Sequence, residues 1–409
     1  MAKGKKITVT GTKETWTGTK GNDTINVKGS KSYNIDAKDG NDTITVYKGN
    51  KHSINTGNGA NKIYIKAGTL HTITGGKNTD KLYLSKGSVK TANLGAGDDV
   101  VSVTGGTLKS VNLGAGKNKL TVTGGTVSSV VGGSGKDTIT VSAQKKITIK
   151  AGNGDNEITV TGIDNRYFSK VSTSIIKGGN GVDTVNLKKG GYNRVTTLGG
   201  DDIINVTGGS NVLLSDDGND KITVTSKYAN CVDAGNENDT ITLKGKSFNN
   251  VICGGYGNDT IHMKNSNPTD YYNYLEGGPG NDTYHLYSLS TPVFLNNVNG
   301  NAGSNYKDNL VIHEDMSRIT ELLYDSYNDV LGINKKILIG NFSDFNTIKI
   351  NSGSSVLSFS AGQVENLAEL VRYDPSSFSY VSEARNNLYA IANDQVTDEI
   401  AQIVGYAGK

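Results

Sequence analysis

Short alternations of aliphatic and polar residues recur along the chain at a fixed interval. Ile25-Asn-Val27 returns 19 residues later as Ile44-Thr-Val46. An alternation of period 2 over three or four residues is typical of a short β-strand with one buried face. The alternating pairs are Ile25/Val27, Ile44/Val46, Ile63/Ile65, Leu82/Leu84, Val101/Val103, Leu120/Val122, Ile139/Val141, Ile158/Val160, Val185/Leu187, Ile204/Val206, Ile222/Val224, Ile241/Leu243 and Ile261/Met263.

A second, weaker strand precedes each of these, as in Val111/Leu113 and Ala92/Leu94. Two short strands and two tight turns fill about 19 residues, so each repeat predicts one coil that buries its apolar edge against its neighbours. We therefore expect an all-β parallel β-roll, or β-solenoid, over residues 1–308. A β-sandwich with evenly spaced strands is the alternative architecture.

An aspartate or asparagine, called here the marker residue, stands two positions before the first aliphatic of each pair. The five residues before it and the marker residue itself are called the marker turn. The series first advances in steps of 19 and resumes after an insertion. Its members are Asp23, Asp42, Asn61, Asp80, Asp99, Asn118, Asp137, Asn156, Asp183, Asp202, Asp220, Asp239, Asp259 and Asp282.

The marker turns are rich in glycine, which lets the backbone adopt positive φ and direct carbonyl oxygens toward one point. Stacked turns then combine carbonyl and carboxylate oxygens, which suits a cation with 6–8 oxygen ligands, namely Ca²⁺. Zinc is disfavoured because it prefers nitrogen and sulfur ligands. The fullest copies are Gly178, Gly179 and Gly181 with Asp183, Gly254, Gly255 and Gly257 with Asp259, and Gly277, Gly278 and Gly280 with Asp282.

The motif Gly-Gly-x-Gly-x-Asp-x-aliphatic-x resembles the nonapeptide of the RTX, or haemolysin-type calcium-binding, family. The resemblance extends from about Gly18 to Ile312 and implies a parallel β-roll, calcium held between successive turns, and type I secretion. Two features depart from the family pattern. The repeat is 19 rather than 18 residues long, and the second turn of each coil, as in Thr104-Gly-Gly-Thr, lacks aspartate. One edge of the roll is therefore expected to be free of calcium.

The marker aspartates are the expected ligands of several Ca²⁺ ions. Asn61, Asn118 and Asn156 offer an amide oxygen without the charge, so their turns are expected to bind calcium weakly or not at all. In the alternative interpretation every glycine-rich turn is only a corner. Besides the three glycine-rich copies above, the expected metal residues are Asp23, Asp42, Asp80, Asp99, Asp137, Asp202, Asp220 and Asp239.

Composition fits a thin stack of coils better than a compact globule. Only 34% of the 409 residues are hydrophobic, and 53 are glycine. Such low apolar content also permits disorder. Calcium would order the chain by linking neighbouring turns, so folding coupled to calcium binding is expected.

Charge is distributed unevenly. Residues 1–150 contain 23 lysines, no arginine and nine acidic residues, whereas residues 151–409 contain 19 basic and 30 acidic residues. The simple interpretation is that calcium-poor coils carry solvated lysines. The alternative is an electropositive surface that binds anionic surface glycans or the acidic end of another copy, head to tail. Nucleic acid is not expected, because no binding motif accompanies the lysines.

The glycine period stops near Asn309, so residues 309–409 are expected to form a C-terminal cap and secretion-signal region. Strands are predicted at 310–312, 336–340 and 347–350. Ser360-Ala-Gly-Gln363 resembles a capping box before a helix with Val364, Leu367, Ala368 and Val371 on one face, and a second helix is predicted at about 382–404. No N-terminal signal peptide and no apolar run of transmembrane length is visible.

No catalytic motif accompanies the repeats: His-Glu-x-x-His and Gly-x-Ser-x-Gly are absent. Cys231 and Cys253 are offset by two positions on neighbouring strands, which predicts free thiols. We expect no enzyme but a secreted, extracellular RTX-type calcium-binding repeat protein that acts as a surface, matrix or adhesin element. The alternatives are the repeat-and-export portion of an RTX toxin or exoenzyme, and a glycan-binding or glycan-processing solenoid.

Overall fold

The computed structural model describes residues 3–142, 146–162, 174–189, 191–266, 272–296, 306–352, 355–366 and 369–370. The chain divides into two compact units. Unit 1 comprises Met1–Asn165 and Ser172–Lys189, and unit 2 comprises Arg166–Val171 and Gly190–Lys409. In each unit successive strands pair in parallel within two sheets. This confirms the predicted fold class, a parallel β-solenoid with two short strands per coil.

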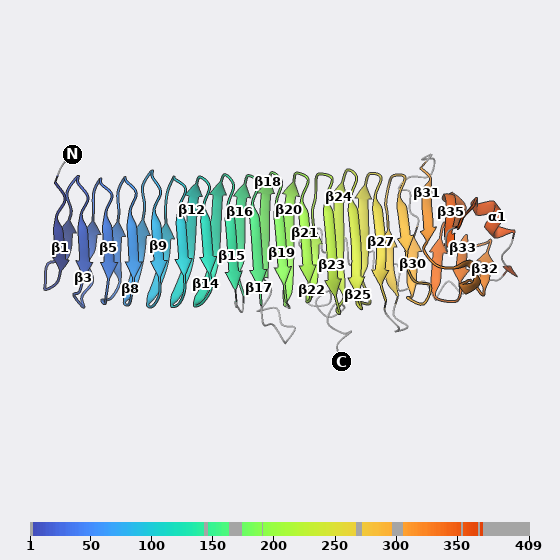
Figure 1. Ribbon diagram of the computed structural model, residues 1–409, viewed down its shortest axis with the longest axis horizontal. Coiled ribbons are helices and arrows are strands. Elements are labelled where there is room, and N and C mark those ends of the chain that lie inside the picture. The colour runs from blue at the N-terminus through green and yellow to red at the C-terminus, as the bar shows by residue number, and fades with distance from the viewer. Residues whose placement is uncertain are drawn as a thin grey trace. The chain divides into compact units, whose positions relative to one another are not determined.

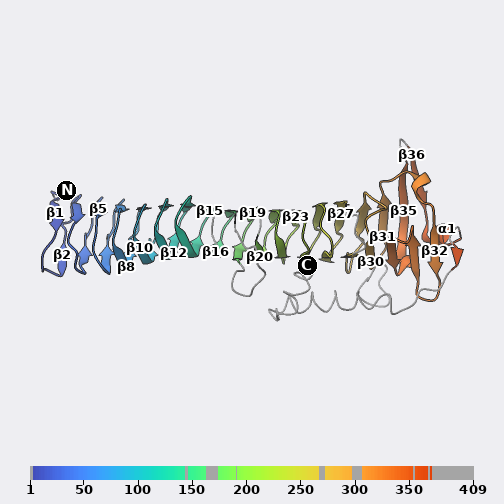
Figure 2. The same cartoon turned by 90° about the horizontal axis from the view of Figure 1, so that it is seen from below.

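Unit 1 alternates strands of the two sheets along the chain. Its first sheet contains β1 (Lys6–Val9), β3 (Thr24–Val27), β5 (Thr43–Val46), β7 (Lys62–Ile65), β9 (Lys81–Leu84), β11 (Val100–Val103), β13 (Lys119–Val122), β15 (Thr138–Ser142), β17 (Glu157–Thr161) and β19 (Thr184–Lys188). Its second sheet contains β2 (Thr15–Thr17), β4 (Asn34–Asp36), β6 (His52–Asn55), β8 (Thr69–Thr74), β10 (Ser88–Asn93), β12 (Thr107–Ala115), β14 (Thr126–Ser134), β16 (Thr148–Asn153) and β18 (Ser174–Asn180). Figure 1 shows the strands of unit 1 stacked side by side, and Figure 2 places β1 and β5 on one side and β2, β8 and β10 on the other.

The 19-residue repeat of the sequence sets the register in which strands pair in each sheet. Val101 pairs with Leu120, and Val111 with Val130, each one repeat apart. The predicted aliphatic pairs are buried in both sheets. In four coils the second sheet buries one further aliphatic three residues earlier, a row that the predicted pairs did not include. Its members are Leu70, Val89, Leu108 and Val127.

Unit 2 repeats the arrangement with less regular coils. One sheet contains β21 (Ile203–Thr207), β23 (Lys221–Ser226), β25 (Thr240–Gly245), β27 (Thr260–Asn265), β29 (Thr283–Leu286), β31 (Asp308–Ile312), β35 (Phe345–Ser352) and β36 (Ser355–Phe359). The other contains β20 (Tyr192–Gly199), β22 (Ser210–Leu214), β24 (Asn230–Asn236), β26 (Val251–Tyr256), β28 (Asn273–Glu276), β30 (Val293–Asn296), β32 (Leu322–Asp325), β33 (Val330–Ile333), β34 (Ile337–Gly340) and β37 (Glu369–Leu370).

The last part of unit 2 departs from the parallel pattern. β33 pairs antiparallel with β32 and β34, and β36 pairs antiparallel with β35. The strands predicted at 310–312, 336–340 and 347–350 are present as β31, β34 and β35. The boundary expected at 308/309 falls within β31, which continues the parallel pairing from β29.

One short helix, α1 (Ala361–Glu365), carries the predicted capping box. The Ser360 hydroxyl accepts a hydrogen bond from the Gln363 N–H, and the Gln363 side chain accepts one from the Ser360 N–H. Leu367, Ala368 and Val371 of the predicted helical face, and the helix predicted at 382–404, lie outside the described residues. No helix in the described part of the chain is long and apolar enough to span a membrane.

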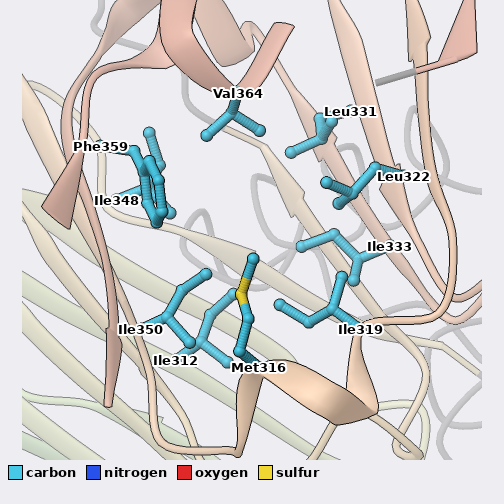
Figure 3. Close-up of a pocket in the computed structure, with 10 residues that line it drawn as sticks. All are labelled: Ile312, Met316, Ile319, Leu322, Leu331, Ile333, Ile348, Ile350, Phe359 and Val364. Carbon is cyan, nitrogen blue, oxygen red and sulfur yellow. The ribbon is translucent and has the colours of Figure 1, made fainter. Parts of the chain in front are cut away.

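An apolar pocket joins the final coil of unit 2 to the elements that follow it. Ile312 of β31 and Ile348 and Ile350 of β35 line one part, and Leu331 and Ile333 of β33 another. Figure 3 shows Val364 of α1 directed into the same pocket. Described residues between Ile312 and Val364 thus contribute apolar side chains to one pocket beside the last parallel strands of unit 2.

Candidate calcium sites in the marker turns

The marker residues are buried, although most are carboxylates. None of the marker residues from Asp23 to Asp282 is more than 2% exposed. Burial of a carboxylate is costly unless it is paired, hydrogen-bonded or bound to a metal. The hydrogen-bond partners of the two carboxylate oxygens therefore decide whether a marker turn needs a cation.

One side-chain oxygen of each marker residue has a structural partner. The backbone N–H of one marker residue donates to Oδ1 of the next, at 2.7 to 3.0 Å, from Asp23 to Asp183 in unit 1. The same ladder runs from Asp202 to Asp282 in unit 2, and on to Asp308, at 2.7 to 2.8 Å. Aspartate and asparagine both carry this oxygen, so the ladder accepts either residue.

The second carboxylate oxygen lacks a hydrogen-bond donor in many of the turns. These buried Oδ2 atoms belong to Asp42, Asp99 and Asp137 in unit 1 and to Asp220, Asp239, Asp259, Asp282 and Asp308 in unit 2. A buried acceptor without a partner is destabilising, and more so when it is charged. A cation beside these oxygens would remove that cost.

Burial shifts the protonation of these carboxyl groups. It raises the pKa of Asp99 to about 7 and that of Asp239 to about 8, with repulsion from neighbouring marker carboxylates as a smaller cause. Burial, and then repulsion from Asp308, raises the pKa of Asp282 to about 9. Without a cation, these groups hold a proton at pH values where an exposed aspartate is ionised.

Glycine five residues before the marker residue makes room for Oδ2. A Cβ added at Gly132 would lie 2.3 Å from Oδ2 of Asp137 and 2.1 Å from the carbonyl oxygen of Ala151 in the next coil. At Gly254 the corresponding distances are 2.2 Å to Oδ2 of Asp259 and 2.6 Å to the carbonyl oxygen of Gly277. In these two turns the carboxylate oxygen and a carbonyl oxygen of the next turn thus converge on the space beside the glycine.

These donors fit a calcium ion. Every ligand atom identified is an oxygen, which suits hard Ca²⁺ and not zinc. The described residues contain no group of three or more His, Cys, Asp or Glu side chains able to hold a metal. An ion in these turns would therefore need backbone carbonyl oxygens beside the marker carboxylates as ligands.

Three aspartate turns are arranged differently. Oδ2 accepts the N–H of the residue four positions earlier: Thr19 at 2.6 Å for Asp23, Gly76 at 3.4 Å for Asp80, and Gly179 at 2.9 Å for Asp183. In these turns a backbone N–H already provides Oδ2 with a hydrogen-bond donor, so a cation would stabilise the carboxylate less. The sequence motif alone did not separate them from the turns with an unpartnered oxygen, because the difference lies in the backbone conformation.

The structure adds Asp308 to the marker residues. Its Oδ1 accepts the N–H of Asp282 at 2.7 Å, and it is fully buried. Burial raises its pKa to about 7. The signal that could have identified it is the spacing Asp308-x-Leu310-x-Ile312, which repeats the marker pattern without a complete glycine motif.

The second turn of the coils in unit 2 contains a buried asparagine column that the sequence analysis missed. Nδ2 of each asparagine donates to Oδ1 of the next, at 2.6 to 3.0 Å. Each of them stands nine residues before a marker residue, a period that was visible in the sequence. The members are Asn193, Asn211, Asn230, Asn250 and Asn273. This edge of unit 2 is held by side-chain amides, consistent with a calcium-free edge.

Neither cysteine forms a disulfide, as predicted. Cys231 pairs with Val251 and Cys253 with Asp233, so the two thiols are offset by two positions along neighbouring strands. His262 and His285 are in register on β27 and β29, and their rings stack at 4.5 Å. Nδ1 of His285 lies 2.9 Å from Nε2 of His313, which forms a histidine pair rather than a metal cluster.

Known proteins resemble this chain in two respects. The family model of the RTX calcium-binding nonapeptide repeat matches residues 193–224 and 233–262, both in unit 2. A solved structure of a hyperactive, Ca²⁺-dependent, β-helical antifreeze protein from an Antarctic bacterium is 17% identical, with a TM-score of 0.40 over 87% of this chain and 94% of that chain. No curated protein matches. The family match confirms the resemblance seen in the sequence.

Proposed function

We propose that this chain of RTX calcium-binding repeats is an extracellular structural or adhesive element that is secreted and folds on binding several Ca²⁺ ions. The observation that carries the proposal is the row of buried Oδ2 atoms without hydrogen-bond donors in the aspartate turns. In cytosol with little free calcium these buried oxygens would lack a partner or require a proton, which would leave neighbouring turns only loosely joined. Calcium outside the cell would neutralise them and join each turn to the next.

Circular dichroism with ion counting tests this proposal. In calcium-free buffer the β-signal should fall, and added calcium should restore it with several ions bound per chain, counted by native mass spectrometry. Magnesium at the same concentration is the control, because it demands a tighter octahedral site. An unchanged spectrum and melting temperature without calcium would contradict coupled folding.

The proposed role is non-catalytic. The sequence carries neither of the hydrolase motifs considered above, and its outward strand residues are mainly Thr, Asn, Lys and Tyr. The alternative, a glycan-processing solenoid, is tested by a hydrolase and lyase screen on polysaccharides in the presence of calcium. Turnover above that of a heat-denatured control would overturn the non-catalytic assignment.

A basic and aromatic patch of unit 1 favours an anionic surface glycan as partner. Lys62 is in register with Lys81, and Tyr64 with Tyr83, whose rings stack at 5.0 Å. The pairs offer ammonium groups for carboxylate or sulfate and aromatic surface for sugar rings. Replacing Lys62 and Lys81 with Glu should abolish binding to a sulfated polysaccharide, whereas the same change at the exposed Lys90 and Lys109 of the other sheet should preserve it. Equal losses would indicate diffuse charge attraction without a patch.

The second proposed partner is another copy of the chain, head to tail. The charge difference between residues 1–150 and 151–409 would attract the two parts between molecules. A contact of this kind repeats without closing and therefore forms filaments. Light scattering over a concentration series, in calcium at low and high salt, should show salt-sensitive growth. A monomer under every condition would exclude the filament.

A further inference from the structure

Asn61, Asn118 and Asn156 close their marker turns with their own side chains. Nδ2 of Asn61 donates to the carbonyl oxygens of Gly57 at 3.4 Å and Gly59 at 2.9 Å. In the other two turns the acceptors are again the residues four and two positions before the asparagine. For Asn118 the distances are 3.3 and 3.2 Å, and for Asn156 they are 2.9 and 2.7 Å.

The orientation of each amide follows from its other contact. Oδ1 of Asn118 accepts the N–H of Asp99 at 2.9 Å, the ladder bond that every marker residue makes. The other end of the side chain must therefore be the NH₂ group, which can only donate. Two carbonyl oxygens converge on that group, as they would on a cation.

The backbone is alike in the asparagine and aspartate turns of unit 1. Gly114 and Gly116 before Asn118 have φ of 91° and 128°, and Gly95 and Gly97 before Asp99 have φ of 99° and 136°. The N–H of Gly116 and the N–H of Gly97 each donate at 2.8 Å to a carbonyl oxygen of the following coil. An aspartate turn thus presents the same two carbonyl oxygens, with a carboxylate oxygen in place of the amide.

We propose that the amide nitrogens of Asn61, Asn118 and Asn156 replace a calcium ion, so that these three turns are closed without metal. The inference rests on the proposed binding of calcium in the aspartate turns and deepens it. Aspartate whose Oδ2 has no hydrogen-bond donor, as at Asp99, creates an ion site, whereas asparagine fills the same place with two N–H donors. The choice between the two residues therefore helps to set the number of ions in unit 1.

This assignment changes the meaning of the asparagine turns. On sequence grounds these turns are expected to bind calcium weakly or not at all, because an amide oxygen lacks charge. In the structure the amide oxygen belongs to the ladder and the NH₂ group lies where the ion would bind. An NH₂ group repels a cation, so these turns exclude calcium at any concentration at which the turn stays closed.

Two reciprocal substitutions test the proposal in the full chain. Asn118→Asp should add one calcium ion by native mass spectrometry and lower the melting temperature in calcium-free buffer. Asp99→Asn should remove one ion and raise the melting temperature in calcium-free buffer by about 2–4 °C, the shift expected for roughly 1 kcal/mol in a chain segment of this size. Asn93→Asp, on the exposed face of β10, introduces the same charge outside the turns and should change neither quantity.

The outcomes separate this inference from the proposed function. If the wild type binds no calcium, the proposed function fails, yet a higher melting temperature of Asp99→Asn in calcium-free buffer still supports the amide closure. If the wild type binds calcium but Asn118→Asp gains no ion, the closure is wrong while the function stands. Asn118→Ala serves as a further measurement: it should lower stability with and without calcium and leave the ion count unchanged, and a lower ion count would overturn the proposal.

Discussion

Marker aspartates such as Asp99 and Asp137 use their two carboxylate oxygens differently. Oδ1 accepts the backbone N–H of the preceding marker residue, whereas the buried Oδ2 has no hydrogen-bond donor and needs a positive group or a proton. A calcium ion, a proton on the carboxyl group or the amide of asparagine can each meet that need. The chemistry of one side-chain atom therefore decides whether a coil depends on metal.

The proton provides a prediction about pH. Burial raises the pKa of Asp99 to about 7 and of Asp239 to about 8, from an ordinary value of 3.8. Between about pH 4 and pH 8 the calcium-free folded state then binds more protons than the unfolded state, so its free energy of unfolding should fall as pH rises. Saturating calcium requires ionised carboxylates, so its stabilising effect should grow over the same range.

Thermal melts of metal-stripped protein from pH 4.5 to 8, with and without calcium, measure both trends. The difference between the two melting temperatures should widen steadily toward pH 8. A calcium-free melting temperature that rises with pH would show that the buried carboxylates do not control stability.

Gly132 gives a prediction about space in the turn. A Cβ there would lie 2.3 Å from Oδ2 of Asp137, so Gly132→Ala must displace a carboxylate oxygen that we assign to the ion. Displacing one of the oxygens around the ion should weaken calcium binding in this turn. A calcium titration of the variant should lose one tight site. Gly362→Ala in α1, where nothing lies within 4 Å, is the control and should bind calcium as the wild type does.

At the scale of the coil, the two turns hold neighbouring coils together by different means. In unit 2 the marker turns carry carboxylates, and the opposite turns carry the asparagine column from Asn193 to Asn273, in which each Nδ2 donates to the next Oδ1. The column is buried and needs no ion. Each coil of unit 2 therefore combines one edge proposed to depend on calcium with one edge that is complete in itself.

Asn230→Ala tests the column in calcium-saturated protein. The substitution removes the hydrogen bond that Nδ2 of Asn211 donates to Asn230 and the one that Nδ2 of Asn230 donates to Oδ1 of Asn250. Asn211 keeps the carbonyl oxygen of Gly208 as a partner, and Asn250 keeps the backbone N–H of residue 230. Each lost hydrogen bond costs about 0.5–1.5 kcal/mol, so the free energy of unfolding in urea should fall by about 1–3 kcal/mol. Asn258→Ala removes an exposed asparagine of the marker turn and should cost within about 0.5 kcal/mol. Equal losses would mean that burial of the column is unimportant.

The period and the alternating aliphatics were enough to predict the strands, their register and the marker residues. The pairing of Val101 with Leu120 follows directly from a repeat of 19 residues. The role of Asn118 could not be predicted in this way, because it depends on which end of the amide faces the glycine carbonyls. Likewise, the N–H of Gly179 reaches Oδ2 of Asp183 through a local backbone conformation that the motif Gly-Gly-x-Gly does not specify.

At the scale of the whole molecule, the two units have different marker series. In unit 1 asparagines at 61, 118 and 156 interrupt the aspartates. In unit 2 the marker residues Asp202, Asp220, Asp239, Asp259, Asp282 and Asp308 are all carboxylates. Repulsion between successive members contributes to the raised pKa of Asp239 and Asp282. Without calcium, the coils of unit 2 should therefore be the less stable ones.

Hydrogen exchange followed by mass spectrometry tests this difference strand by strand. In calcium-free buffer at pH 8, amides of β21 to β29 in unit 2 should exchange faster than amides of β11 to β17 in unit 1, because Asp220 and Asp259, with pKa values of about 7 and about 6, are ionised and only unit 1 has amide-closed turns. Calcium should protect β21 to β29 by the larger factor. Without calcium, Asp239→Asn should restore part of the protection of β23 and β25. The neutral amide removes the repulsion that Asp259 and Asp220 exert on the native carboxyl group. Equal exchange of the two sets of strands without calcium, or earlier loss of protection in β11 to β17, would contradict the proposed order.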